Sequence, residues 1–326
     1  MNGNVELIIL RMMYAVRSNR YANAARIQTQ NKPMTRTGFP AITLSLTLLL
    51  CVIPGSSSAQ EVQRDIVFAS AGDRELKLDF YPAESGEVAP LIVWVHGGAW
   101  RRGDKSNVPI RPLTQQGFAV ASVNYRLSEV ARFPAQTQDI KAAIRFLRAS
   151  ADRFRIDPSR IAIAGASAGG HLAALVGVSD GVSSLEDLSM GNSDTASGVS
   201  AIVSLYGASN LETILSQSTP HGLGVRVPAL ELLLGDTPDK VPDLARSASP
   251  VAHVDRSDPP LLMIHGDQDP QMPINQSHEL DGVYQQLGLD ATFHVLHGAA
   301  HGGKAFYTPQ QLELMAGWIK SKLPKE

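Results

Sequence analysis

The stretch that decides the fold is Ile161-Ala162-Ile163-Ala164-Gly165-Ala166-Ser167-Ala168-Gly169-Gly170. Its apolar beginning, residues 161–164, is typical of a buried parallel strand, and a helical pattern over residues 169–178 follows directly. Between the two, Gly-x-Ser-x-Gly allows a sharp, strained turn that pushes the hydroxyl of Ser167 out above the sheet. Ser167 is therefore the candidate nucleophile. The alternative is a glycine-rich turn with an incidental serine.

Around this turn, short apolar runs alternate with helical patterns. Strands are predicted at residues 91–95, 118–123, 161–164, 201–206, 261–264 and 292–296, and helices at residues 110–116, 136–153, 169–178, 276–287 and 309–323. Two shorter runs, residues 65–69 and 75–81, predict an antiparallel hairpin ahead of them. The pattern predicts an α/β fold with a mostly parallel central sheet, an antiparallel N-terminal hairpin and helices on both faces.

Residues 207–258 interrupt the alternation, because about fifty residues separate two predicted strands that a normal connection would join in far fewer. The segment contains several prolines and a helical pattern at residues 227–234. It is expected to form a small cap insertion over one edge of the site.

A second glycine-rich segment, His96-Gly97-Gly98-Ala99-Trp100, follows the strand predicted at residues 91–95. Small residues let backbone N–H groups approach an oxygen on which negative charge develops. Backbone N–H groups of this loop, together with that of Ala168, the residue after the candidate nucleophile, are therefore the candidate oxyanion hole. The alternative is a tight turn that contains a structural histidine.

A serine nucleophile needs a histidine base and a carboxylate that orients the histidine. After the last predicted strand the chain carries His297 and His301, and we expect His301 to be the base. After the strand at residues 261–264 it carries Asp267 and Asp269, and the longer reach along the loop favours Asp269 as the acid. His297 and Asp267 remain the alternatives.

The composition excludes several classes of function. Lysine plus arginine (29) nearly balances aspartate plus glutamate (31), and no run of five like charges occurs, so no nucleic-acid partner is expected. The other histidines lack metal-ligand spacing, so neither a metal nor a cofactor is expected. His171, inside the helix after Ser167, is expected to be a core or supporting residue.

The chain divides by charge into two parts. Residues 1–59 carry six basic residues and one acidic residue, whereas residues 60–326 carry 23 basic and 30 acidic residues, a net charge of −7. The first part contains an uncharged apolar stretch, residues 41–53, which is shorter than the roughly 20 residues that span a bilayer. Small residues at 57 and 59 then suit a signal-peptidase site. We therefore expect a signal peptide with an over-extended start in residues 1–59 and a catalytic domain over residues 60–326.

Two expectations follow from this division. The product is secreted or periplasmic, without stable membrane insertion. The single cysteine, Cys51, falls in the removed part, so the mature protein has no disulfide and no thiolate site.

Taken together, the motifs resemble those of the α/β-hydrolase carboxylesterases, in the branch of hormone-sensitive-lipase-like esterases and bifunctional acetylxylan and feruloyl esterases. The resemblance spans about residues 65–323 and rests on His96-Gly97-Gly98-Ala99-Trp100, Asn124-Tyr125-Arg126-Leu127, Phe133-Pro134 with Asp139, Gly165 to His171, His265-Gly266 with Asp269 and Pro273, and His301-Gly302. It implies an α/β-hydrolase fold with Ser167 as nucleophile, Asp269 as acid and His301 as base. It further implies that Gly98, Ala99 and Ala168 line the oxyanion hole, with Gly97 shaping the loop.

Two departures from the family pattern favour the acetylxylan and feruloyl esterase branch. Ala99 stands where the hormone-sensitive-lipase-like esterases usually have a third glycine, and residues 60–65 are too few to build their large N-terminal cap. The expected function is a secreted serine carboxylesterase for short-chain or aromatic acyl esters of a small molecule or a polysaccharide. Trp100 either stacks on an aromatic acyl group or packs under the loop. The alternatives are an aryl formamidase or peptidase-like amide hydrolase, and a catalytically silent binding protein; the oligomeric state stays open.

Overall fold

The computed structural model describes residues 61–325, so the expectations for residues 1–59, including Cys51, lie outside the described part. The strands are β1 (Gln63–Ala71), β2 (Arg74–Tyr81), β3 (Ala89–Val95), β4 (Ala119–Val123), β5 (Ile156–Ala166), β6 (Ala201–Leu205), β7 (Leu261–Gly266) and β8 (Ala291–Leu296). The α-helices are α2 (Ala135–Ala149), α3 (Ala151–Phe154), α4 (Ala168–Gly177), α5 (Ile214–Gln217), α6 (Pro220–Leu234), α7 (Pro242–Ser247), α8 (Asn275–Leu287) and α9 (Pro309–Lys322). Short 3₁₀ helices are η1 (Arg111–Gln116), η2 (Ser183–Leu185), η3 (Leu188–Met190), η4 (Pro250–Ala252) and η5 (Lys304–Tyr307).

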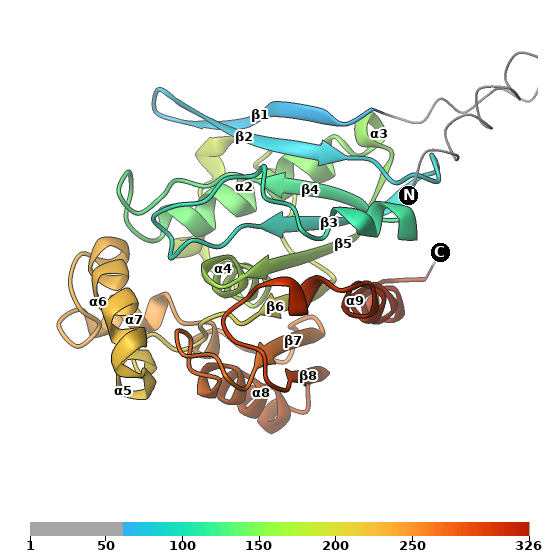
Figure 1. Ribbon diagram of the computed structural model, residues 1–326. Coiled ribbons are helices and arrows are strands. Elements are labelled where there is room, and N and C mark those ends of the chain that lie inside the picture. The colour runs from blue at the N-terminus through green and yellow to red at the C-terminus, as the bar shows by residue number, and fades with distance from the viewer. Residues whose placement is uncertain (1–60, 326) are drawn as a thin grey trace, which may run out of the picture. The chain divides into compact units, whose positions relative to one another are not determined.

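The strands form one eight-stranded sheet in the order β1-β2-β4-β3-β5-β6-β7-β8 (Figure 1). β1 pairs with β2 and β2 with β4 in antiparallel fashion, and every later pair is parallel. The predicted α/β architecture with an antiparallel N-terminal hairpin is confirmed. Because β3 to β8 run parallel, the loops that follow them collect at one edge of the sheet.

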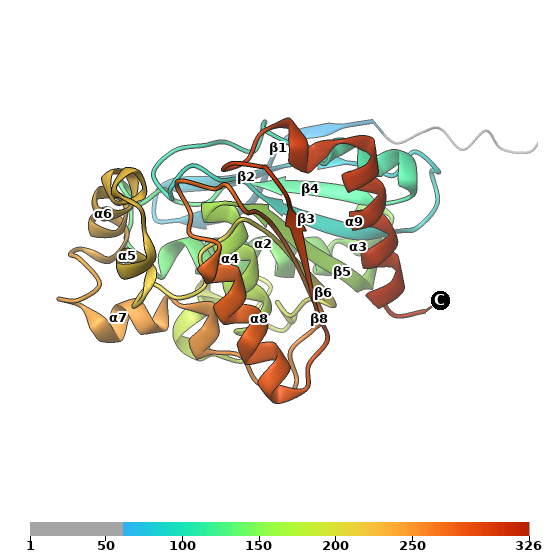
Figure 2. The same cartoon turned by 60° about the horizontal axis from the view of Figure 1, so that its bottom comes forward.

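Both faces of the sheet are buried, which explains why its central strands are continuous apolar runs. In β3, Val93 and Val95 pack into the core shared with α2, α4 and α8, whereas Ile92 and Trp94 pack into the core shared with η1 and α9. α9 lies on the near side of the strands in Figure 2. Packing on both faces thus holds the strands in place, and with them the loops at the carboxyl edge of the sheet.

The insertion between β6 and β7 contains α5, α6 and α7, which lie together at one side of the molecule beyond α4 (Figure 1). The helix predicted at residues 227–234 is only the end of α6, which begins at Pro220 and contains Pro228. Prolines in a helical segment normally favour a helix end, so the sequence pattern predicted a helix that is too short. Burial of Leu230 and Leu233 and the cap that Thr219 provides at the first turn override that preference.

The single helix predicted at residues 136–153 is also wrong in detail. The structure divides it into α2 and α3 around Ser150, and the chain leaves α3 through Arg155 in a left-handed conformation, with φ of 52°. Apolar periodicity continues across the break because Phe154 is buried, and periodicity alone therefore does not reveal it.

Candidate active site

Ser167 stands at the turn between β5 and α4 with φ of 56° and ψ of −119°. A residue with a side chain rarely adopts this conformation, so the surrounding structure must hold it. Gly169 makes the tight turn feasible, because a Cβ there would overlap the carbonyl oxygens of Val95 and His96. The structure therefore has the strained elbow that the sequence predicted, with Ser167 at its tip.

Three predicted residues meet at the carboxyl edge of the sheet. Oγ of Ser167 lies 2.9 Å from Nε2 of His301, and Nδ1 of His301 lies 2.6 Å from Oδ2 of Asp269. The residues come from the segments after β5, β8 and β7, respectively. With Asp269 ionised, Nδ1–H donates to the carboxylate, which leaves Nε2 free to accept the proton of the serine hydroxyl. The arrangement places Nε2 of His301 where it can take the serine proton, while Asp269 holds the imidazole.

The carboxylate of Asp269 is fully buried and its oxygens are well satisfied. Oδ1 accepts the backbone N–H groups of Gln271 and Met272, each at 2.8 Å. Burial by itself would raise the pKa of Asp269, but hydrogen bonds from His265 and His301 outweigh it and hold the pKa well below the usual range. Asp269 is thus an anion that orients His301.

His265 is a neighbour of Asp269 whose role the residue patterns did not reveal. Its Nε2–H donates to the carbonyl oxygen of Met272 at 3.1 Å and lies 3.4 Å from Oδ2 of Asp269. Because the Met272 carbonyl oxygen can only accept, Nε2 carries the proton, and Nδ1 accepts the hydroxyl of Ser277 at 2.8 Å. His265 therefore presents N–H, not a lone pair, to the acid.

The alternative acid and base pair with each other. Nδ1 of His297 lies 2.8 Å from Oδ2 of Asp267, and the N–H of Gly298 donates to Oδ1 of Asp267. The His297 side chain is 86% exposed, and that of Asp267 is 30% exposed. No hydrogen bond among the described residues joins this surface pair to Ser167.

The candidate oxyanion loop lies directly against the elbow. A Cβ at Gly97 would come within 2.7 Å of the carbonyl oxygen of Ala166, so only glycine lets the two backbones approach this closely. Gly98 and Ala99 both have positive φ, of 120° and 53°. Within residues 61–325, the amide N–H groups of Gly98 and Ala99 donate no hydrogen bond, as expected of groups that receive a substrate oxygen. Ala168 opens α4, where a first-turn N–H also lacks a helical partner.

Trp100 anchors this loop to α4 through His171. Its side chain is fully buried, its Nε1–H donates to Nδ1 of His171 at 3.0 Å, and Nε2–H of His171 donates to the carbonyl oxygen of Ala248 at 2.7 Å. Burial lowers the pKa of His171 to about 4, so its imidazole is neutral. The stacking of Trp100 on an acyl group is therefore wrong, because no face of the indole is open to a substrate. His171 is a supporting residue, as expected.

His96 has a similar structural role at the start of the loop. Its ring is buried and stacks on Tyr125 with centroids 4.5 Å apart, and the Tyr125 hydroxyl donates to the His96 carbonyl oxygen at 3.0 Å. Nδ1–H of His96 donates to the carbonyl oxygen of Gly97 at 2.8 Å. Burial lowers the pKa of His96. A structural histidine and the candidate oxyanion loop thus occur in the same segment.

The cap contacts the loop that carries the acid. Oγ1 of Thr219 donates to the Pro270 carbonyl oxygen at 2.6 Å, and a guanidinium nitrogen of Arg226 donates to the Gln271 carbonyl oxygen at 2.9 Å. Arg226 is fully buried, and its Nε has no hydrogen-bond partner among the described residues. Burial lowers the pKa of Arg226 to about 10, against the opposing charge of Asp269. No spacing in the sequence connects Arg226 with the acid.

A cavity of about 970 Å³ opens over Ser167 and is lined by the elbow, the oxyanion loop and the segment after His301. Tyr206 borders it, with its ring edge-on to His301 at 4.9 Å and its hydroxyl 2.9 Å from that of Tyr307. The volume is that of a typical small-molecule site and exceeds what an acetyl group alone would fill.

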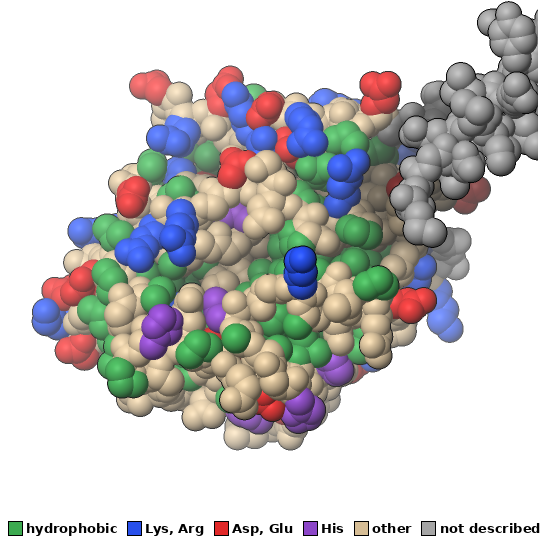
Figure 3. All heavy atoms as spheres, in the orientation of Figure 1, with side chains coloured by type: hydrophobic (Ala, Val, Ile, Leu, Met, Phe, Trp, Pro, Cys, Tyr) green, Lys and Arg blue, Asp and Glu red, His purple; other side chains and the backbone are tan. Residues whose placement is uncertain are grey.

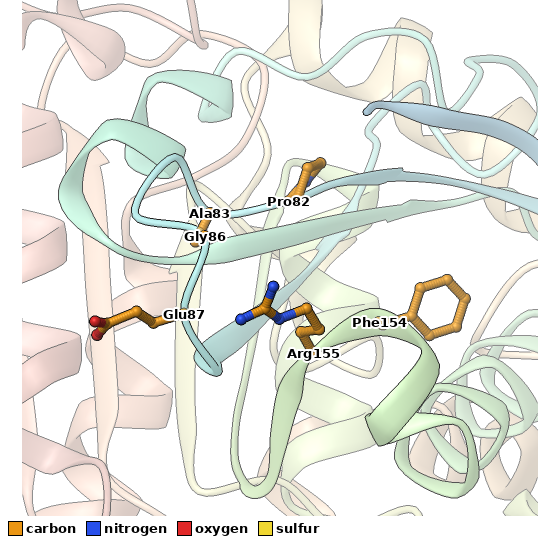
Figure 4. Close-up of a pocket in the computed structure, with 6 residues that line it drawn as sticks. All are labelled: Pro82, Ala83, Gly86, Glu87, Phe154 and Arg155. Carbon is orange, nitrogen blue, oxygen red and sulfur yellow. The ribbon is translucent and has the colours of Figure 1, made fainter. Parts of the chain in front are cut away.

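A second cavity, shown in Figure 4, lies where β2 ends and β5 begins, away from the carboxyl edge. It measures about 10 Å³ and is lined by Pro82, Ala83, Gly86, Glu87, Phe154 and Arg155. This is room for about one water molecule, so it is not a candidate site.

In residues 61–325 no group of three or more His, Cys, Asp or Glu side chains is placed to hold a metal. No helix in that range has both the length and the apolar character to cross a membrane.

The sheet order, the strained serine after β5 and the relay at the carboxyl edge define a protein of the α/β-hydrolase class. Within that class, the chain belongs to the BD-FAE family, whose model matches residues 78–283.

Individual relatives agree with this assignment. Esterase LipC of Mycobacterium tuberculosis is 35% identical over 66% of this chain and 53% of its own length. A truncated carbohydrate esterase from gut microbiota has a TM-score of 0.74 and 32% identity, covering 82% of this chain and 98% of its own. An acetyl ester-xyloside bifunctional hydrolase from Caldicellulosiruptor lactoaceticus has a TM-score of 0.67 and 26% identity, covering 80% and 97%. The chain spans about half the length of the curated relatives it matches.

Proposed function

We propose that this protein is a carboxylesterase in which Ser167, His301 and Asp269 form the catalytic triad. The observation that carries the proposal is the unbroken hydrogen-bonded path from Oγ of Ser167 through His301 to the buried carboxylate of Asp269. Membership of a carboxylesterase family and esterases among the similar proteins support it.

In this mechanism Oγ of Ser167 attacks the ester carbonyl carbon while Nε2 of His301 takes the hydroxyl proton. The tetrahedral oxyanion receives the N–H groups of Gly98, Ala99 and Ala168, and removing one such donor from an oxyanion hole costs about 3–4 kcal/mol of transition-state stabilisation. The intermediate collapses as His301 protonates the leaving alcohol. Water, deprotonated by His301, then cleaves the acyl-enzyme and releases the acid.

Short acyl groups are the proposed acyl part of the substrate. Trp100 and His171 fill the space between the oxyanion loop, α4 and Ala248, which closes that space to an acyl chain. The alcohol part is proposed to be a carbohydrate or a small alcohol, supported by the carbohydrate esterase and the acetyl ester-xyloside bifunctional hydrolase among the similar structures. An aromatic acyl group would have to bind against Tyr206 and Tyr307 rather than Trp100.

A panel of nitrophenyl esters from acetyl to decanoyl tests the proposal. We expect kcat/KM to be highest from acetyl to butyryl and to fall beyond hexanoyl, because each methylene without a pocket gains none of the roughly 0.8 kcal/mol of its burial. A steady rise to decanoyl would exclude the short-acyl site. A matched anilide that is cleaved as fast as its ester would instead favour the amide-hydrolase alternative.

Export is proposed separately, on the basis of the apolar stretch at residues 41–53 and the small residues that follow it. The secreted product is expected to begin at Gln60. An intact mass that still includes Cys51 would contradict this proposal.

A further inference from the structure

The charged side chains that line the cavity over Ser167 are all basic. Arg102 and Lys304 line it, and none of the side chains that line it is an aspartate or a glutamate. This contrasts with residues 60–326 as a whole, in which acids outnumber bases by seven. On the face shown in Figure 3, acidic side chains lie mainly towards the edges.

Both cations are uncompensated. Within the described part of the chain, neither the Arg102 guanidinium nor the Lys304 ammonium has an ion pair, a hydrogen bond or an aromatic partner. Asp104, the acidic residue nearest to Arg102 in the sequence, accepts hydrogen bonds from Ser106 and Asn124 and not from Arg102. Asp269 is held by His301. Positive potential therefore remains at the cavity for a ligand to neutralise.

The two cations lie on two different segments beside Ser167, one after the candidate oxyanion loop and one after His301. Arg102 follows the oxyanion loop, and its side-chain Cγ lies close enough to Gly98 that a Cβ there would meet it at 3.0 Å. Lys304 begins η5, three residues after His301. A substrate whose ester sits on Ser167 therefore has one cation beside the oxyanion donors and another beside the base.

We propose that the substrate of this site carries a carboxylate that Arg102 and Lys304 recognise. This inference rests on the proposed esterase function. The carboxylate belongs either to the alcohol part, as in an acylated saccharide that contains a uronic acid, or to the far end of the acyl part. A cavity of about 970 Å³ has room for such a group beside the ester.

Two matched pairs of esters separate these sources. For the alcohol part, 4-acetoxybenzoate is compared with neutral 4-acetoxybenzamide. For the acyl part, the mono-4-nitrophenyl ester of hexanedioic acid is compared with 4-nitrophenyl hexanoate. In each pair the ratio of kcat/KM, anionic over neutral, is measured for the wild type and for variants. Dividing the variant ratio by the wild-type ratio cancels the intrinsic reactivity of the esters.

The double variant Arg102→Gln with Lys304→Gln is expected to lower this ratio about tenfold in one pair, and the pair that responds identifies the source. Exposed charges are screened by salt, so the wild-type ratio is also expected to fall as ionic strength rises from 0.01 to 0.5 M. The control double variant is Arg74→Gln with Lys240→Gln, which removes the same charge from exposed positions outside the cavity. It is expected to leave both ratios within about twofold of wild type.

Unchanged ratios in both pairs, or an equal fall in the control variant, would overturn the carboxylate proposal while leaving the esterase proposal intact. Failure of the wild type to hydrolyse any of the four esters would overturn the proposed function itself. Circular dichroism and the single variants Arg102→Gln and Lys304→Gln identify a loss caused by misfolding.

Discussion

The indole N–H of Trp100 donates to Nδ1 of His171 at 3.0 Å, and the two rings meet edge to face with centroids 5.2 Å apart. Through Nε2–H of His171, the same contact reaches the Ala248 carbonyl oxygen in the insertion. The oxyanion loop, the helix that follows Ser167 and the insertion are thereby joined by one neutral imidazole. We expect the position of the loop backbone at Gly98 and Ala99 to depend on this imidazole.

Stability is expected to depend on the protonation of His171. Its pKa is about 4 in the folded protein and near the ordinary 6.5 in the unfolded chain. Below pH 6.5 the unfolded chain binds a proton that the folded protein does not, so stability falls as pH decreases from 6.5 towards 4, by on the order of 3 kcal/mol from this group.

Thermal unfolding of wild type and His171→Gln from pH 8 to 4 measures this effect. The variant is expected to be less stable at pH 8 but to lose less stability on acidification. The control is His221→Gln, at an exposed position in α6, which should follow the wild-type profile. Parallel curves for wild type and His171→Gln would mean that other groups cause the acid sensitivity.

Ser167→Ala is expected to abolish ester hydrolysis without unfolding the protein, because within residues 61–325 the hydroxyl makes a single hydrogen bond, to His301. Loss of a triad residue typically lowers kcat by about 10⁴-fold or more. Turnover of the acetyl ester and circular dichroism are the measurements. Residual activity above about one per cent of wild type would contradict the role of Ser167.

Asp269→Asn is expected to reduce kcat by about 10⁴-fold, because an amide cannot hold His301 in the tautomer that accepts the serine proton. Asp267→Asn is the matched control on the same loop. It changes only surface contacts, with His297, Gly298 and Gln268, so its kcat should stay within about threefold of wild type. Equal losses in the two variants would show that the carboxylate was assigned wrongly.

Arg226→Met is expected to lower kcat about tenfold or more while leaving the free energy of unfolding nearly unchanged or increased. Replacing a buried charge by an apolar side chain of similar volume is often neutral or stabilising. The loop that holds Asp269, however, loses its contact at Gln271, and small displacements of a catalytic group reduce the rate strongly. Arg256→Met is the control at an exposed arginine that donates to the Leu287 carbonyl oxygen. A loss of stability with unchanged kcat would assign Arg226 a purely structural role.

Much of this molecule could be predicted from local patterns. Alternating short apolar runs and helical periods predicted the mostly parallel sheet and its antiparallel beginning, because both periodicities arise from backbone geometry within a few residues. The strained turn at Ser167 could also be predicted from the sequence. Its glycines follow from the close approach of backbones at the turn, so the need for them is expressed in the same short stretch as Ser167.

Choices between similar residues a few positions apart depended on the tertiary structure. Asp267 and Asp269 share a loop, as do His297 and His301, and side-chain chemistry does not distinguish the members of either pair. Which member faces Ser167 depends on how loops after three strands fold against one another, across 134 residues of sequence between Ser167 and His301.

The same reason explains the supporting residues. The local sequence does not indicate which residues Arg226, His265 and Trp100 contact. Each acts through a contact with a residue that is not adjacent in the sequence. Trp100 could equally have faced a substrate or the core, and only burial against His171 decided between the two. The sequence by itself determined the fold and a short set of candidate residues. Packing between distant loops determined which candidates meet and what holds them there.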